Sequence, residues 1–166
     1  MANSKDPVPP VWKEGALSYS TGLTFDTAKK MIDAAMAEAK KQGLTMVIAI
    51  ADAGGNSVAF GRMDDAMLAS IQIAMDKAFT AVYGKIPTQI WRMIVQSGNI
   101  PPLFIHERWT AFPGGFLLIK GKQLLGGIGC SGATAYGDTS VARAALGAGG
   151  FSTEDADAIL KELNQG

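Results

Sequence analysis

Two pairs of short apolar segments, each joined by a glycine-containing turn, most constrain how this 166-residue chain can fold. In the first pair, residues 45–51 (TMVIAIA) and 57–63 (SVAFGRM) are separated by a Gly-Gly-Asn turn. In the second pair, residues 116–120 (FLLIK) and 123–130 (QLLGGIGC) flank Gly121-Lys122. Such segments are too short for typical helices, and their turns are typical of hairpins. The sequence therefore predicts two antiparallel β-hairpins.

Helical patterns lie before, between and after the hairpins, because apolar residues recur there at helical spacing. Each expected helix has a capping or terminating residue. The first expected helix follows Thr24 and ends at Gly43, and the second runs from Ala66 to Tyr83 with Asp64 or Asp65 as its cap. The third starts at Pro87 and Thr88 and ends at Gly98, and the fourth covers residues 139–146 with Asp138 as its cap. The last runs from Ser152 or Thr153 to about Leu163.

These elements predict one α+β domain. Two hairpins that join edge to edge form a central antiparallel sheet, and the helices flank its apolar faces. The order does not suit a Rossmann crossover fold. Residues 1–22 contain three prolines and mixed polar residues, so we expect an irregular N-terminal arm followed by the domain over residues 23–166.

The charge content limits the partners of the chain. Only 18% of the residues are charged, and fifteen basic and fifteen acidic side chains give a formal net charge of zero. No block of lysine or arginine stands out, so we expect no nucleic-acid or membrane partner. A neutral surface with few charges favours self-association, so a homo-oligomer is expected.

The cysteine content and the N-terminus favour a cytoplasmic location. Cys130 is the one cysteine, which excludes an internal disulfide and a cysteine-based metal cluster. The N-terminal residues contain no apolar signal core, and no segment is long enough to span a bilayer.

The first hairpin and its exit contain candidate ligand-binding residues. Gly54 and Gly55 allow a positive φ, which serves either a tight turn or the close approach of a ligand. Arg62 and Asp64 lie on one face of the strand by period-two spacing. Arg62 could hold a carboxylate or phosphate through two hydrogen bonds, or it could form a structural pair with Asp64.

Lys77 is a candidate because it is a long cation in an otherwise small, polar stripe of its helix. The residues that share its face are Ser70, Ala74, Thr80, Ala81 and Gly84. Lys77 could project into a pocket as an anion anchor or as a base with a lowered pKa. Alternatively, it could extend to the surface or pair with Asp52 or Asp64.

His106 is the one histidine and thus the one imidazole for acid–base chemistry or metal ligation. A hydrogen-bonded packing role in its aromatic loop is the alternative.

A second glycine cluster comprises Gly114, Gly115 and residues 126–132 (GGIGCSG). It lacks the strand–glycine–helix order of a phosphate loop and the pattern of a nucleophile elbow. Close packing of chains, or of a flat ligand, suits these glycines better.

Three segments together resemble the GlcG/HbpS-like, or haem-degrading-domain, family. They are IADAGGNSVAFGRMDDA, MDKAFTA and PGGFLLIKGKQLLGGIGCSGATAYGD, and the similarity runs from about Leu23 to Ala148. The resemblance implies an antiparallel sheet flanked by helices and assembly into even-numbered oligomers, often octamers. Members include haem-binding sensors, haem-binding domains of cobalamin adenosyltransferases, and proteins encoded beside catabolic genes, so function diverges within the family.

The positions that match the family motifs look like fold-keeping residues that also line a cleft between subunits. They are Asp52, Gly54, Gly55, Arg62, Asp64, Lys77, Thr80, Gly114, Gly115, Gly129, Ser131, Gly132 and Asp138. Family members commonly carry a proline soon after the double glycine, whereas residues 116–118 here are Phe-Leu-Leu. This departure predicts a bulkier, more apolar cleft wall.

For haem iron, only His106, Cys130, a methionine or a hydroxyl could be a ligand.

Three functional hypotheses follow, in order of preference. The first is a small-molecule-binding protein, accessory to a catabolic pathway, that holds haem between subunits. Its expected cofactor-binding residues are His106, Met63, Gly54, Gly55, Gly114 and Gly115. No metal site other than haem iron is expected.

The second hypothesis is an enzyme that acts on a small organic acid, carbonyl compound or aromatic catabolite. Arg62 would hold a carboxylate, Lys77 would orient or deprotonate the substrate, and His106 would complete the acid–base chemistry. The third is a non-catalytic oligomer that stabilises a partner enzyme.

Overall fold

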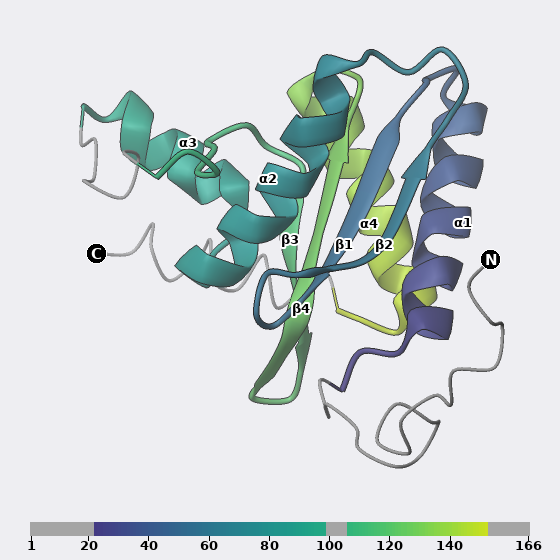
Figure 1. Cartoon of the computed structure of the whole chain (residues 1–166). Coiled ribbons are helices and arrows are strands. Elements are labelled where there is room, and N and C mark those ends of the chain that lie inside the picture. The colour runs from purple at the N-terminus through teal and green to yellow at the C-terminus, as the bar shows by residue number, and fades with distance from the viewer. Residues whose placement is uncertain (1–21, 99–105, 153–166) are drawn as a thin grey trace, which may run out of the picture.

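The computed structural model describes residues 22–98 and 106–152, and in these ranges it shows four helices and four strands (Figure 1). The predicted arm and the last predicted helix, which begins at Ser152 or Thr153, lie outside the described residues except at their edges. The elements in chain order are α1 (Phe25–Lys41), β1 (Val47–Asp52), β2 (Ser57–Arg62), α2 (Ala69–Gly84), α3 (Thr88–Gln96), β3 (Gly115–Lys120), β4 (Gln123–Ser131) and α4 (Ala135–Gly149).

The four strands form one antiparallel sheet in the order β2-β1-β4-β3. Each predicted hairpin supplies two neighbouring strands, and β1 pairs with β4 to join the hairpins. In the centre of the sheet, Ala49 is opposite Gly129, which is in turn opposite Gly115. The predicted α+β class, with a sheet built from two hairpins, is confirmed.

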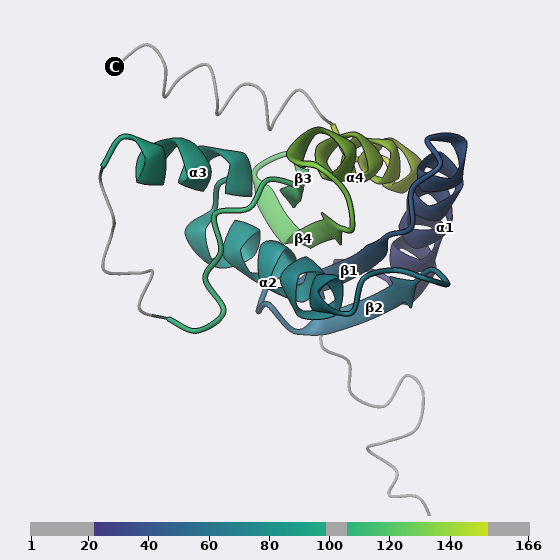
Figure 2. The ribbon, with the colours of Figure 1, turned by 90° about the horizontal axis from the view of Figure 1, so that it is seen from above.

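The helices cover both faces of the sheet. Helices α1 and α4 lie side by side on one face, and α2 packs on the opposite face (Figure 2). The main core lies between the sheet and the α1–α4 pair. Its fully buried members include Met31, Ile48, Ile128 and Leu146. In the described ranges, no helix has the length and apolar character needed to cross a membrane.

Residues 116–118 do not form the bulky cleft wall that the sequence predicted. Phe116 and Leu118 are 1% and 0% exposed and belong to the core between the sheet and the α1–α4 pair. Successive side chains of a strand point to opposite faces of a sheet, so only Leu117 points towards α2. The apolar departure from the family pattern therefore fills the core.

Two predicted helix starts are wrong. Helix α2 begins at Ala69, three residues later than expected, because Asp65 has a left-handed backbone (φ 61°) and belongs to a turn. Helix α4 begins at Ala135, where the Thr134 hydroxyl accepts a hydrogen bond from the Gly137 N–H at 3.3 Å. Asp138 therefore lies in the first turn of α4 and does not cap it. The predicted cap of α1 at Thr24 and the predicted start of α3 at Pro87 and Thr88 are confirmed.

Glycines allow α2 to lie directly on the sheet. A Cβ atom at Gly129 would lie 2.0 Å from the Ala74 carbonyl oxygen, and one at Gly127 would lie 2.7 Å from the Ala78 oxygen. A Cβ at Gly115 would lie 2.6 Å from the Lys77 oxygen. The second glycine cluster thus serves close packing of helix on strand within one chain.

We expect Gly129→Ala to destabilise the fold by about 1–3 kcal/mol or more, because the added methyl group collides with the backbone of α2. Gly147→Ala is the matched control. Gly147 is an exposed helical residue with open space around its Cβ position, so alanine there should stabilise the fold by about 0.5–1 kcal/mol. Urea denaturation measures both effects. Equal stability of the two variants would contradict the proposed packing.

Candidate functional site

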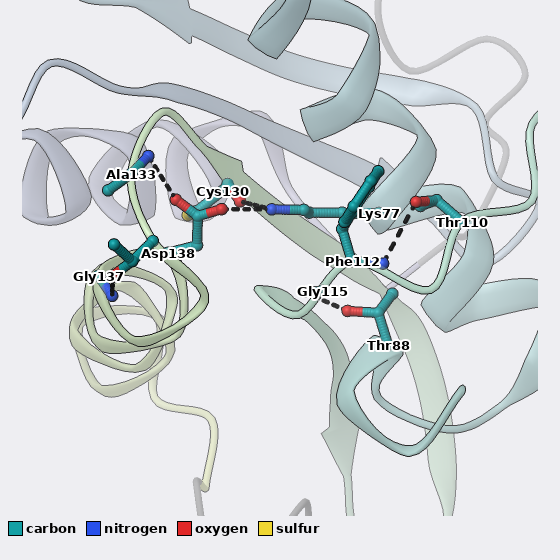
Figure 3. Close-up of polar contacts among 10 residues, drawn as sticks. Lys77, Thr88, Thr110, Phe112, Gly115, Cys130, Ala133, Gly137 and Asp138 are labelled. Carbon is teal, nitrogen blue, oxygen red and sulfur yellow. Dashed lines mark hydrogen bonds and ion pairs between the residues drawn. The ribbon is translucent and has the colours of Figure 1, made fainter. Parts of the chain in front are cut away.

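A buried ion pair between α2 and α4 is the centre of the candidate site (Figure 3). Lys77 is 1% exposed, and its Nζ lies 2.5 Å from Oδ2 of Asp138. The same ammonium group donates a hydrogen bond to the Cys130 carbonyl oxygen at 2.8 Å. Oδ1 of Asp138 accepts a hydrogen bond from the Ala133 N–H at 2.9 Å. The pair thereby connects α2, the end of β4 and the first turn of α4.

The segment that precedes β3 is shaped to fit against this pair. Gly114 has φ 111°, and a Cβ there would lie 2.8 Å from both the Asp138 Cβ and the Cys130 oxygen, and 3.3 Å from the Lys77 Nζ. The next residue, Gly115, donates its N–H to the Thr88 hydroxyl of α3 at 2.9 Å. A side chain at position 114 would displace the ion pair, so this glycine belongs to the site.

Burial sets the electrostatics of the pair. Loss of water lowers the pKa of Lys77 and raises the pKa of Asp138, while the attraction between the two charges opposes both shifts. These directions bring the energies of the ionised and the neutral pair closer together. A lysine and a carboxyl group perturbed in this way occur in structural ion pairs and also at sites where protons are exchanged with a ligand.

Cys130 does not provide a nucleophile at this site. Its side chain is fully buried in the α1–α4 core, and burial raises the pKa of the thiol strongly. Only its backbone carbonyl reaches Lys77.

An open cleft of about 260 Å³ lies beside the ion pair. Lys77, Asp138 and Ser131 form part of its lining. The other lining residues come from α2 and the segment before it, α3, the 112–113 segment, the connection between β4 and α4, and the start of α4. They are Met67, Ile73, Arg92, Phe112, Pro113, Gly132, Ala133 and Ala135. The site therefore combines a buried acid–base pair with mostly apolar walls and an exposed arginine.

A second cluster forms on another side of α2, around the ring of Phe79. Tyr83 stacks on Phe79 with ring centroids 4.1 Å apart, and His106 stacks on it at 5.3 Å. The Arg108 guanidinium lies 4.0 Å from the Phe79 centroid and pairs with Asp76 at 3.3 Å. His106 is exposed, and its Nδ1 accepts a hydrogen bond from the Arg108 N–H at 3.2 Å.

The Gly54-Gly55 turn lies against this aromatic cluster. Gly55 has φ 76°, and a Cβ there would lie 2.6 Å from Cε2 of Tyr83 and 3.0 Å from Cδ2 of Phe79. Oδ1 of Asp52 accepts hydrogen bonds from the backbone N–H groups of Gly54 and Asn56. The turn therefore needs its glycine both for a positive φ and for contact with the aromatic rings.

The structure divides the predicted site residues into separate groups. Lys77 lies with Gly114 and Gly115, whereas His106 lies with Gly54 and Gly55 around Phe79. Arg62 is exposed at the far end of β2, opposite Val47, and within the described chain it forms no ion pair with Asp64. Met63 packs against the main core. The chain thus brings neither Arg62 to Lys77 nor Met63 to His106.

The sequence allowed Lys77 to extend to the surface or to pair with Asp52 or Asp64, and both of these interpretations are wrong. Its side chain is buried and pairs with Asp138. Its partner, Asp138, was predicted as a helix cap. Sequence reasoning also missed Arg92 and Arg108. A buried lysine requires a carboxylate partner, but no local pattern identifies one that lies 61 residues away. In the described ranges, no three His, Cys, Asp or Glu side chains gather as a metal site.

Breaking the pair from one side should destabilise the protein more than removing both partners. Lys77→Met or Asp138→Leu leaves one uncompensated buried charge, so each should lower the free energy of unfolding by about 3–5 kcal/mol. The double variant removes both charges and should recover most of this loss. Guanidinium denaturation of the four proteins measures the coupling. Additive losses in the double variant would contradict a direct interaction.

The Asp138→Asn variant should become more stable as the pH rises. Without the carboxylate, desolvation lowers the Lys77 pKa further below its ordinary value of 10.5, so the unfolded chain binds more protons than the folded chain. Stability therefore increases with pH from the lowered pKa up to about 10.5, relative to the wild type. Urea midpoints from pH 6 to pH 10 check this trend, and parallel profiles would contradict it.

Comparisons with known proteins agree with this architecture. A family model described as "Haem degrading protein HbpS-like" matches residues 23–147. Protein GlcG of Escherichia coli K12 is 34% identical over 109 residues, which cover 66% of this chain and 81% of that protein. The corrinoid adenosyltransferase PduO of Citrobacter freundii is 35% identical over 129 residues, which cover 76% of this chain but only 38% of PduO.

A solved structure has the same fold. The crystal structure of a PduOC–heme complex superposes with a TM-score of 0.72 at 32% sequence identity, and the match covers 76% of this chain and 94% of that chain. The family model, the relatives and the shared fold identify the resemblance seen in the sequence as true membership. The chain belongs to the HbpS-like family.

Proposed function

We propose that this protein binds haem through His106 and serves as an accessory protein of a catabolic pathway. The observation that carries the proposal is the cluster around Phe79, which gathers an exposed imidazole, aromatic rings and a guanidinium group on one side of α2. The 32% identity to a protein solved as a heme complex supports it. The accessory role follows from what the sequence resemblance implies.

The residues around Phe79 fit the chemical parts of haem. Imidazole is a common axial ligand of haem iron, and His106 is exposed. Tyr83, which is 56% exposed, offers an aromatic surface to a porphyrin ring. Arg108 provides a cation for a propionate group. Bound haem would supply iron-centred ligand binding and redox chemistry.

Ligation requires one adjustment at His106. Because Nδ1 accepts a hydrogen bond from the Arg108 N–H, the neutral ring carries its proton on Nε2. Coordination through Nε2 moves that proton to Nδ1 and breaks this bond, which costs about 0.5–1.5 kcal/mol. A micromolar complex releases about 8 kcal/mol, so the adjustment does not prevent binding.

The other predicted iron ligands suit the site less well. Cys130 is buried in the core, and Met63 packs against the same core at the opposite end of β2 from Gly55. Six residues of strand separate that end from the turn, a span of roughly 20 Å. His106 is therefore the ligand that we propose.

Self-assembly into an even-numbered homo-oligomer, such as an octamer, stays a prediction. Several large apolar side chains are exposed on the single chain, which supports it. They include Met67, Leu68, Tyr83, Met93, Phe112 and Tyr136. In such an assembly, a second subunit could cover the other face of a haem held by His106.

A hemin titration followed by absorbance tests the proposal. We expect a saturable Soret shift with the wild-type protein, and a loss of affinity of at least about tenfold in His106→Ala because the iron loses its ligand. Met63→Leu is the matched control, because Met63 is a predicted ligand that lies elsewhere, and it should titrate like the wild type. No saturable shift, or an unchanged titration of His106→Ala, would contradict the proposal.

A further inference from the structure

Three adjoining hollows meet at the side chain of Arg92. The cleft of about 260 Å³ beside the ion pair shares Arg92 with two others of about 330 Å³ each. One continues along α3 to the start of α4, where Tyr136 and Thr139 line it. The other lies between α3 and the segment that contains Phe112. Arg92 is therefore the charged group common to the whole concave surface.

Arg92 is free to bind an anion. It is exposed, and it forms no ion pair or hydrogen bond with another residue in the described part of the chain. The nearby carboxylate, Asp138, is already neutralised by Lys77 and bonded to the Ala133 N–H. A guanidinium group with no partner among the described residues, in a concave and mostly apolar surface, suits a planar carboxylate, which it can hold through two parallel hydrogen bonds.

Ser131 provides a second, independent polar group in the same cleft. It lines the cavity and is only 5% exposed. Its hydroxyl makes no hydrogen bond to any other described residue and is not among the fully buried polar atoms, so it is accessible from the cleft. A ligand with a hydroxyl or carbonyl oxygen would replace water as its hydrogen-bond partner next to Lys77 and Asp138.

We propose that this cleft binds a small carboxylic acid that has an apolar body and a hydroxyl or carbonyl substituent. Arg92 holds the carboxylate, Phe112, Pro113 and Met67 enclose the apolar body, and Ser131 receives the oxygen substituent. The substituent then lies beside the Lys77–Asp138 pair, which can accept or donate a proton. This site is separate from the proposed haem-binding face around Phe79.

The size and the lining of the cleft select this class of ligand. The part of the concave surface beside the ion pair has a volume of about 260 Å³, just below the roughly 300–1,000 Å³ of pockets for drug-sized ligands, so it suits a small molecule. Inorganic phosphate has no apolar part and would leave the walls formed by Met67, Ile73 and Phe112 uncovered. Mandelate, an aromatic 2-hydroxy acid, has all three required parts.

Isothermal titration calorimetry of the full chain with mandelate tests the proposal. We expect saturable binding to the wild type. Arg92→Gln should weaken it by at least about tenfold, because a charge-assisted contact is lost. Arg62→Gln is the matched control, since it removes another exposed arginine, the one that was the predicted carboxylate clamp. It should bind mandelate within about twofold of the wild type. Thermal unfolding should show that both variants are folded.

Further probes define which contacts are made. Phenylacetate lacks the hydroxyl group, so the wild type should bind it more weakly than mandelate. Ser131→Ala lacks the partner of that hydroxyl group, so this variant should bind the two acids equally. Inorganic phosphate should not compete. Absence of saturable binding by mandelate and phenylacetate, an unchanged affinity in Arg92→Gln, or a loss confined to Arg62→Gln would each overturn the proposal.

A crossed experiment separates this site from the haem site. Hemin titration of Arg92→Gln should match the wild type, and mandelate binding to His106→Ala should be unchanged. If Arg92→Gln instead loses hemin and mandelate competes with hemin, the arginine serves a haem propionate, and the separate acid site is overturned. Failure of hemin binding alone leaves the mandelate result intact.

Discussion

The ion pair between Lys77 and Asp138 joins α2 to the first turn of α4 and, through the Cys130 carbonyl, to the end of β4. Taking two charges out of water costs several kcal/mol per ion, and that cost is offset only when the geometry and the additional hydrogen bonds are good. Here the Cys130 carbonyl and the Ala133 N–H supply those bonds. Because every partner must be in place at once, the pair fixes how α2, β4 and α4 meet, and with them the walls of the cleft.

The position of Lys77 depends on the absence of side chains beneath it. Glycines at 127 and 129 of β4 and at 115 of β3 let the backbone of α2 approach the sheet, and Gly114 leaves room for the ammonium group. A larger residue at these positions would lift the helix and carry Lys77 away from Asp138. The glycines that resemble a ligand-binding loop in the sequence therefore act mainly through packing, and they shape the site indirectly.

The local patterns of the sequence predicted the sheet and the approximate positions of the four helices in the described ranges. Glycine turns between apolar segments predicted both hairpins, and helical spacing predicted α1, α2 and α3, because these signals arise from near neighbours. The site was less predictable. Asp138 carries the same signal whether it caps a helix or pairs with a lysine 61 residues earlier. Arg92, in an amphipathic helix, has the spacing of a solvated side chain, and only tertiary structure reveals the hollows that meet there.

Helix α2 explains why Lys77 and His106, which the sequence suggested for one active site, lie in different places. His106 contacts the helix through Phe79, two residues after Lys77. At 3.6 residues per turn, side chains two positions apart diverge by roughly 200°, so Lys77 and Phe79 point to nearly opposite sides. One side faces β4, α4 and the cleft, and the other faces the Gly54-Gly55 turn and Arg108. A single helix thus supports two chemically distinct surfaces, and a ligand of one need not exclude a ligand of the other.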